Sequence, residues 1–233
     1  MSPTLNLLCA GAAKGLVQAL RAPFKEQTGA DISGQFGAVG AMRQALLDGA
    51  ACDLMVVTDA MLHSLAAAGA LVAASITPLG RVRTGVAVPL GTPLPDVATP
   101  EALKAALLAS AGIYFPDPER ATAGIHFAKV LRELGIFDAL APRLHTFPNG
   151  ATAMRAMADA GLPGLIGCTQ VSEILYTDGV ALVGALPPQF ELATLYSAAV
   201  ASAATQPELA QTLLALMAGP ASATLRAAGG FVE

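Results

Sequence analysis

Residues 114–135, YFPDPERATAGIHFAKVLRELG, combine the residue types and spacing that an anion site needs. An apolar run ends in the turn residues 116–118, and Thr122 stands at the N-cap position before small residues and an apolar series with helical spacing. The sequence therefore predicts a strand, a turn and a helix. The free backbone N–H groups of the first turn, with the positive end of the helix dipole, would bind an anion. These N–H groups belong to Ala123, Gly124 and Ile125. An ordinary capped helix without a ligand is the alternative interpretation.

Further polar groups stand at other predicted turns. Lys14 lies at a helix start, where the dipole disfavours a cation, so it indicates either a ligand contact or a solvated surface lysine. Arg81 and Arg83 either form bidentate pairs with a carboxylate ligand or stand at a hinge. Neutral donors predicted to contact the ligand follow two later strands, and they are Asn149, Gly150, Thr169 and Gln170.

Strands and helices alternate through the segments that would position these groups. Apolar runs at 5–10, 31–36 and 52–57 predict strands, and each precedes a small-residue or capping turn and a segment with helical spacing. This alternation predicts an α/β fold with a mostly parallel, doubly wound sheet, whose strand carboxyl ends form the ligand crevice. The positions predicted to line that crevice are Gly11, Ala12, Ala13, Ala38, Val39, Gly40 and Thr58.

The second half of the chain repeats this organisation. Strands are predicted at 84–88 and 144–147, a further strand ends at 165–167, and a strand at 193–201 returns to the first half. We therefore predict two lobes, residues 1–80 with 197–233 and residues 81–196. The chain would cross between them near 80–84 and 193–198, with helices on both faces of each sheet and a ligand cleft between the lobes.

The composition restricts the partners. The 233 residues are 54% hydrophobic and carry a net charge of −4, and no basic stripe predicts a nucleic-acid partner. No apolar run is long enough for a membrane span, so we expect a small ligand and a monomer or weak dimer. The beginning of the sequence has no leader, which predicts a cytoplasmic protein; removal of a leader would make it periplasmic.

The cysteines give no sign of a disulfide framework or metal site. Cys9 and Cys52 lie in apolar runs and are expected in the core, whereas the role of Cys168 is open. The sequence contains neither a nucleotide-binding motif nor a zinc-protease motif. We therefore predict neither a cofactor nor a metal.

The sequence resembles the type II periplasmic binding proteins, and within them the molybdate-binding-protein-like group. The resemblance covers nearly the whole chain and rests on CAGAAKGL at 9–16, FGAVGAMRQALLDGAACDLMVVTD at 36–59 and DPERATAGIHFAKVLRELG at 117–135. It implies two α/β lobes that close on a small anion held by amides and hydroxyls. For an exported member, it also implies a permease of an ABC transporter as the partner.

The chain departs from this group at three hydroxyl positions. Where molybdate binders place two serines and a tyrosine, this sequence has Ala12, Val39 and Gly167. An unpaired buried charge costs several kcal/mol, so the departures favour an organic polycarboxylate over molybdate. A molybdate- or oxyanion-binding transport component is one alternative function.

Another alternative comes from the segments GAAKG, TAGIHFAKVL, GCTQVSEIL and VGALPPQ, which look most similar to the aconitate isomerase-like branch. This resemblance implies an enzyme that shifts a double bond in a tricarboxylic acid, which requires a base near an acidic carbon. Lys14 and His126 are the candidate bases, with Tyr114, Cys168 and Glu173 as further candidates. His126 packing beside a strand and Glu173 lying on a helix surface are the structural alternatives.

Overall fold

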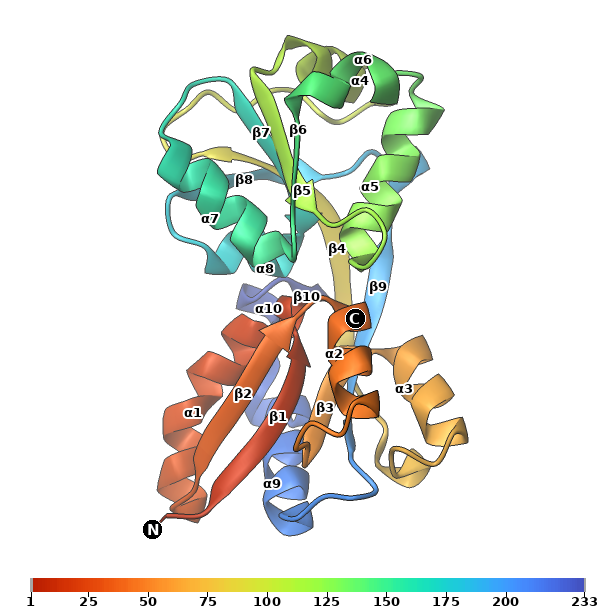
Figure 1. Cartoon of the computed structure of the whole chain (residues 1–233). Coiled ribbons are helices and arrows are strands. Elements are labelled where there is room, and N and C mark those ends of the chain that lie inside the picture. The colour runs from red at the N-terminus through yellow and green to blue at the C-terminus, as the bar shows by residue number, and fades with distance from the viewer. Residues whose placement is uncertain (1, 233) are drawn as a thin grey trace. The chain divides into compact units, whose positions relative to one another are not determined.

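The computed structural model describes residues 2–232 (Figure 1). The chain divides into two compact units: Met1–Arg81 with Thr194–Glu233, and Val82–Ala193. Two strands carry the chain from one unit into the other, β4 (Thr77–Pro89) and β9 (Ala193–Val200).

The first unit has a mixed sheet with the strand order β2-β1-β3-β9, in which β2, β1 and β3 are parallel and β9 is antiparallel to β3. Helix α1 packs against β2 and α9, whereas α2 packs on β1 and α3 on β3. The elements are β1 (Thr4–Ala10), a 3₁₀ turn (Gly11–Ala13), α1 (Lys14–Thr28), β2 (Asp31–Gly37), α2 (Val39–Leu47), β3 (Leu54–Thr58), α3 (Asp59–Ala67), a 3₁₀ turn (Ala73–Ser75), α9 (Pro207–Ala218), a 3₁₀ turn (Pro220–Ser222), α10 (Ala223–Ala228) and β10 (Phe231–Val232).

The second unit has the strand order β4-β7-β5-β6, and β8 also pairs with β4. Strands β5, β6 and β7 are parallel, whereas β4 runs antiparallel to β7 and β8. The elements are α4 (Pro100–Ala109), β5 (Gly112–Pro116), α5 (Thr122–Glu133), α6 (Phe137–Leu140), a 3₁₀ turn (Ala141–Arg143), β6 (Leu144–Phe147), α7 (Gly150–Ala160), β7 (Leu165–Gln170), α8 (Val171–Tyr176), β8 (Val180–Ala185) and a 3₁₀ turn (Pro188–Phe190).

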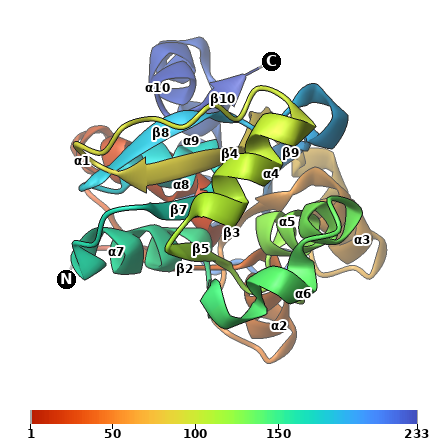
Figure 2. The same cartoon turned by 90° about the horizontal axis from the view of Figure 1, so that it is seen from above.

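Side-chain alternation along β7 divides the core of the second unit into two layers. Ile166 and Cys168 belong to the apolar cluster under α5, whereas Leu165 belongs to the cluster under α7. Helices α5 and α7 lie on opposite sides of β5 and β7 in both views (Figure 1, Figure 2). Because successive strand residues point to opposite faces, Thr169 faces α7 and Gln170 faces the other layer.

The predicted α/β class and the alternation of strands and helices are confirmed. The strand expected at 84–88 begins earlier, at Thr77. The boundary between the lobes that the sequence predicts near residue 80 therefore lies inside a strand. Gly80 has φ +138°, and a Cβ there would lie 3.0 Å from the carbonyl oxygen of Val232. The glycine therefore serves the contact between β4 and β10. Among residues 2–232, no helix is both long and apolar enough to cross a membrane.

Candidate functional site

The carboxyl ends of the three parallel strands lie side by side in the second unit. Pro116 of β5 pairs with Phe147 of β6, and Tyr114 pairs with Gly167 of β7. Just beyond this edge, the Asp117 N–H donates to the Phe147 carbonyl oxygen at 2.7 Å. The turns before α5, α7 and α8 therefore come together at one edge of the sheet, as the sequence predicts.

Helix α5 begins with no side-chain cap. The prediction that Thr122 is the N-cap is wrong, because Ala121 holds this position and Thr122 is the first helical residue. The Ile125 N–H is not free, since it donates to the Ala121 carbonyl oxygen at 2.9 Å. The N–H groups of Thr122, Ala123 and Gly124 have no partner inside the helix and point out of its first turn.

Gly124 is held tightly against the turn that precedes α5. A Cβ on Gly124 would lie 2.2 Å from the Asp117 carbonyl oxygen and 2.3 Å from that of Pro116. The Asp117 carboxylate accepts the N–H groups of Glu119, at 2.7 Å, and Arg120, at 3.1 Å. Glycine is required at 124 because helix and turn touch, so a substitution there would disturb the fold.

The predicted Asn149–Gly150 turn begins α7 and is capped by its own side chain. The Asn149 Oδ1 atom accepts the N–H and the hydroxyl of Thr152, both at 2.9 Å. Asn149 is therefore the N-cap of α7, which explains its presence without a ligand.

A buried carboxylate lies at the start of the same helix. Glu173 is 5% exposed, and the expectation that it lies on a helix surface is wrong. Its Oε2 accepts the Thr169 hydroxyl at 2.6 Å, and its Oε1 accepts the Ala151 N–H at 3.3 Å. The backbone N–H groups of Gln170 and Gly150 also bond to it. Burial raises the pKa of Glu173 above that of an ordinary glutamate, and these hydrogen bonds reduce the rise without cancelling it.

The spacing of Gln170 and Glu173 is the sequence signal for this arrangement. Gln170 is the N-cap of α8 and Glu173 the third helical residue, so the side chain reaches back to the N-cap N–H as in a capping box. The signal is weak because glutamine is not a favoured N-cap.

The other donors predicted on β7 are also engaged within the second unit. With its amide oriented to satisfy its neighbours, Gln170 donates to the carbonyl oxygens of Val82 and Arg83, each at 3.2 Å. Gly167 lies inside β7 rather than at its end, and a Cβ there would lie 2.5 Å from the Met154 side chain. Met154 therefore occupies the space into which a side chain at position 167 would extend.

His126 is bonded to the backbone of a distant segment. Its Nε2 lies 2.7 Å from the Phe190 carbonyl oxygen. A carbonyl oxygen only accepts, so Nε2 carries the proton and Nδ1 is the basic nitrogen of the neutral ring. The Tyr114 ring contacts those of His145 and Phe147, and Cys168 is fully buried.

The first unit brings its predicted turns together as well. Strand β1 lies between β2 and β3, so the turns after these strands are neighbours. Ala12, Ala13, Ala38 and Val39 are buried, whereas Gly11, Lys14, Gly40 and Thr58 are partly exposed. The Lys14 Nζ lies 5.8 Å from the centroid of the Phe36 ring.

The turn after β3 carries its own carboxylate. Asp59 accepts the Ser197 hydroxyl at 2.6 Å and lies 3.4 Å from His63 Nε2. Arg81 is exposed at the end of the first segment, and Arg83 Nε lies 3.8 Å from a carboxylate oxygen of Glu191. Arg83 is thus beside an acidic side chain of the second unit.

The helix starts differ in the way their first turns are satisfied. Of the helices with nine or more residues in the described chain, α1, α2 and α5 have neither a side-chain cap nor an acidic residue in the first turn. Asp59 begins α3, Thr99 caps α4, Asn149 caps α7 and Glu208 lies in the first turn of α9. The three uncapped starts are the places where an anion would best compensate the helix dipole.

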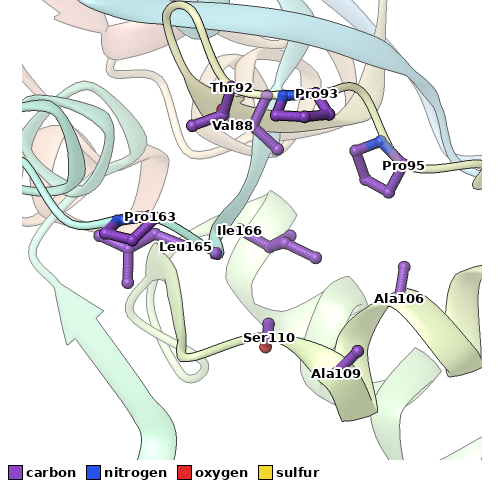
Figure 3. A pocket seen from close by; sticks show the side chains of 11 residues that line it. Val88, Thr92, Pro93, Pro95, Ala106, Ala109, Ser110, Pro163, Leu165 and Ile166 are labelled. Atoms are coloured by element: carbon purple, nitrogen blue, oxygen red, sulfur yellow. The ribbon is translucent and has the colours of Figure 1, made fainter.

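A cavity of about 240 Å³ lies at the opposite edge of the second unit's sheet (Figure 3). Its lining includes Val88, three prolines, Leu165 and Ile166. Its two hydroxyl side chains, Thr92 and Ser110, already donate to backbone carbonyl oxygens. This cavity offers no free side-chain donor and does not suit an anion.

Comparison with known proteins identifies the family. Residues 5–232 match the family model described as bacterial extracellular solute-binding protein. An aconitate isomerase from a Pseudomonas species is 27% identical over 224 residues, which are 92% of this chain and 82% of that protein.

Solved structures show the same fold at low sequence identity. The periplasmic molybdate-binding protein of Azotobacter vinelandii has a TM-score of 0.81 and 18% identity, covering 98% of this chain and 99% of that chain. The sulfate-binding protein of Mycobacterium tuberculosis H37Rv has a TM-score of 0.75 and 18% identity, and the match covers 98% of this chain and 86% of that chain. The chain belongs to the bacterial extracellular solute-binding proteins, with the fold of the type II periplasmic binding proteins.

Proposed function

We propose that the protein binds a small organic anion with more than one carboxylate group. The observation that carries this proposal is the set of uncapped helix starts at α1, α2 and α5, each following the carboxyl end of a parallel strand. First-turn N–H groups and the helix dipole favour a negative group at each of these starts. Membership of a solute-binding family supports a small ligand.

The neutral donors favour a carboxylate over a compact tetrahedral dianion. Ala12 and Val39 offer no hydroxyl, and the Thr169 hydroxyl is bonded to Glu173. A desolvated dianion needs a donor for nearly every oxygen, and none of these three positions has a free side-chain donor for it. Carboxylates that are separated along an organic molecule need fewer donors at each turn.

An isomerase that moves a double bond in a tricarboxylic acid is the second candidate. Its support is the relative described as aconitate isomerase, together with the basic Nδ1 of His126. In this reaction Nδ1 would take a proton from the carbon next to the double bond. The electron pair would shift the double bond by one position, and the proton would return to the far carbon.

Proton NMR in D₂O with cis- and trans-aconitate tests both functions, beside thermal unfolding with citrate, tricarballylate, sulfate and molybdate. Stabilisation by tricarboxylates without interconversion would support a binding protein. Interconversion or deuterium uptake in proportion to protein would support the isomerase. Stabilisation by molybdate alone would contradict both.

A further inference from the structure

The Glu173 carboxylate is bound by a cradle of donors, which we define as the Thr169 hydroxyl and the N–H groups of Gly150, Ala151 and Gln170. The three N–H groups only donate, so they favour a carboxylate that is ionised and accepts from them. The carboxylate thus takes the position of an anion at the start of α7.

The cradle has no room for a second anion. A Cβ on Gly150 would lie 1.8 Å from Thr169 Oγ1 and 2.1 Å from Glu173 Oε2. These distances are far below van der Waals contact, so a ligand oxygen cannot enter between the helix start and the carboxylate. The negative charge of Glu173 would also repel an anion that approached.

The start of α5 has no such carboxylate in its first turn. It lies next to the cradle, because β5 pairs with both β6 and β7, and it has no side-chain cap and no first-turn acid. Of the two long helices that follow parallel strands in the second unit, α7 therefore has a carboxylate of the protein at its first turn, whereas α5 has no first-turn acid.

We infer that Glu173 is a specificity-determining residue: it fills the α7 turn with the protein's own carboxylate and leaves the second unit one turn for a single carboxylate of the ligand. This inference rests on the proposed function. It predicts selection against sulfate and molybdate, since these compact dianions need donors from several turns at once and would meet the Glu173 carboxylate beside them.

The test is chemical rescue of Glu173→Ala, in which the truncated side chain vacates the cradle. Thermal unfolding is measured in sodium formate, sodium acetate and sodium sulfate, against sodium chloride of equal ionic strength. We expect a lowered melting temperature that formate and acetate raise by several degrees more than in the unchanged protein. The matched control is Glu208→Ala, which removes an exposed glutamate from the first turn of α9 and should show no such rescue.

Glu173→Gln keeps the side-chain volume and removes the charge, so it serves if the alanine variant does not fold. Its midpoint for stabilisation by sulfate should be at least tenfold lower than that of the unchanged protein. An equal midpoint, or a folded alanine variant without rescue, overturns the inference.

The outcomes separate this inference from the proposed function. Tricarboxylates that stabilise the unchanged protein, without rescue or altered sulfate response in the variants, leave the function standing and remove the role of Glu173. If formate or acetate rescues Glu173→Ala but no carboxylate stabilises the unchanged protein, Glu173 is supported as the occupant of the cradle and the proposed function is contradicted.

Discussion

The Ser197 hydroxyl donates to the Asp59 carboxylate at 2.6 Å, and it joins β9 to the first residue of α3. The second unit contains a matching pair, in which Thr169 donates to Glu173 over the same distance. In each unit, one helix start near the carboxyl ends of the strands thus has a carboxylate of the protein itself. The starts of α1, α2 and α5 differ from these two, because they have neither a side-chain cap nor an acidic residue in the first turn.

Asp53 has a structural role that the sequence does not reveal. Its carboxylate accepts the N–H groups of Asn6, at 2.7 Å, Thr205, at 2.7 Å, and Gln206, at 2.9 Å. It thereby joins the first strand to the start of α9. Replacing it with Asn should lower the free energy of unfolding by about 2–3 kcal/mol, because a buried charged acceptor is lost. Urea unfolding measures this loss.

The dependence of the unfolding free energy on pH gives a second test of Asp53. Burial alone would raise its pKa, but the hydrogen bonds from Asn6, Gln206 and Thr205 outweigh it and lower the pKa below that of an ordinary aspartate. Its stabilisation is therefore present above the unfolded pKa and is lost as the pH falls through the folded value. The difference in unfolding free energy between the unchanged protein and Asp53→Asn should shrink from about pH 7 to about pH 3. A constant difference would contradict the lowered pKa.

Gly150→Ala tests the close fit of the cradle. The new methyl group would overlap Thr169 and Glu173, so the variant should lose about 1–3 kcal/mol of unfolding free energy. Gly184→Ala is the matched control, because no atom lies within 4 Å of a Cβ there. Equal stabilities of the two variants by urea unfolding would mean that the cradle is looser than described.

The start of α5 allows a nearly isosteric test of charge. Thr122 is the first helical residue and is partly exposed, so Asp and Asn both fit. Asp should stabilise the helix by roughly 0.3–1 kcal/mol and at the same time repel an anionic ligand. We expect at least about tenfold weaker binding of a tricarboxylate by Thr122→Asp than by Thr122→Asn, a change of about 1.4 kcal/mol.

Calorimetry with citrate measures this difference, and unfolding in urea shows that both variants remain folded. The corresponding pair in the first unit is Gly40→Asp and Gly40→Asn, at the start of α2. Equal citrate affinities within both pairs would remove the helix starts from the binding site.

The three thiols should not react in the folded protein. Cys9, Cys52 and Cys168 are buried and free, and burial raises the pKa of Cys52 to about 12 and holds the pKa values of Cys9 and Cys168 well above the usual thiol range. A disulfide reagent should label no thiol in the native state and three after unfolding in urea. Rapid labelling of Cys168 in the native protein would restore it as a candidate base.

Much of the fold follows from local patterns. Apolar runs that end in small residues predict the strands and turns because strand period and turn chemistry depend on nearby residues. Burial of Glu173 could not be predicted in this way, since it depends on Gly150, twenty-three positions earlier, coming within hydrogen-bonding distance. The partners of Asp53 are still more remote in sequence, since Asn6 lies 47 positions away and Thr205 lies 152 positions away.

The same limit applies to the candidate site. The sequence predicts which turns gather, because parallel strands align their carboxyl ends. It does not predict that Thr169 and Gln170 are bonded to their own unit, since a donor at a strand end looks the same whether its partner is a ligand or the protein.

Two substitutions of His126 distinguish its structural hydrogen bond from a role in proton transfer. Because Nε2 donates to the Phe190 carbonyl oxygen, His126→Ala should lose about 0.5–1.5 kcal/mol of unfolding free energy. His126→Gln supplies an N–H donor and should recover much of that loss. Neither variant provides the basic Nδ1, so an isomerase would lose aconitate turnover in both while keeping its stabilisation by tricarboxylates. Turnover that survives in His126→Gln would exclude His126 as the base, whereas equal loss of binding and turnover would make it a ligand contact.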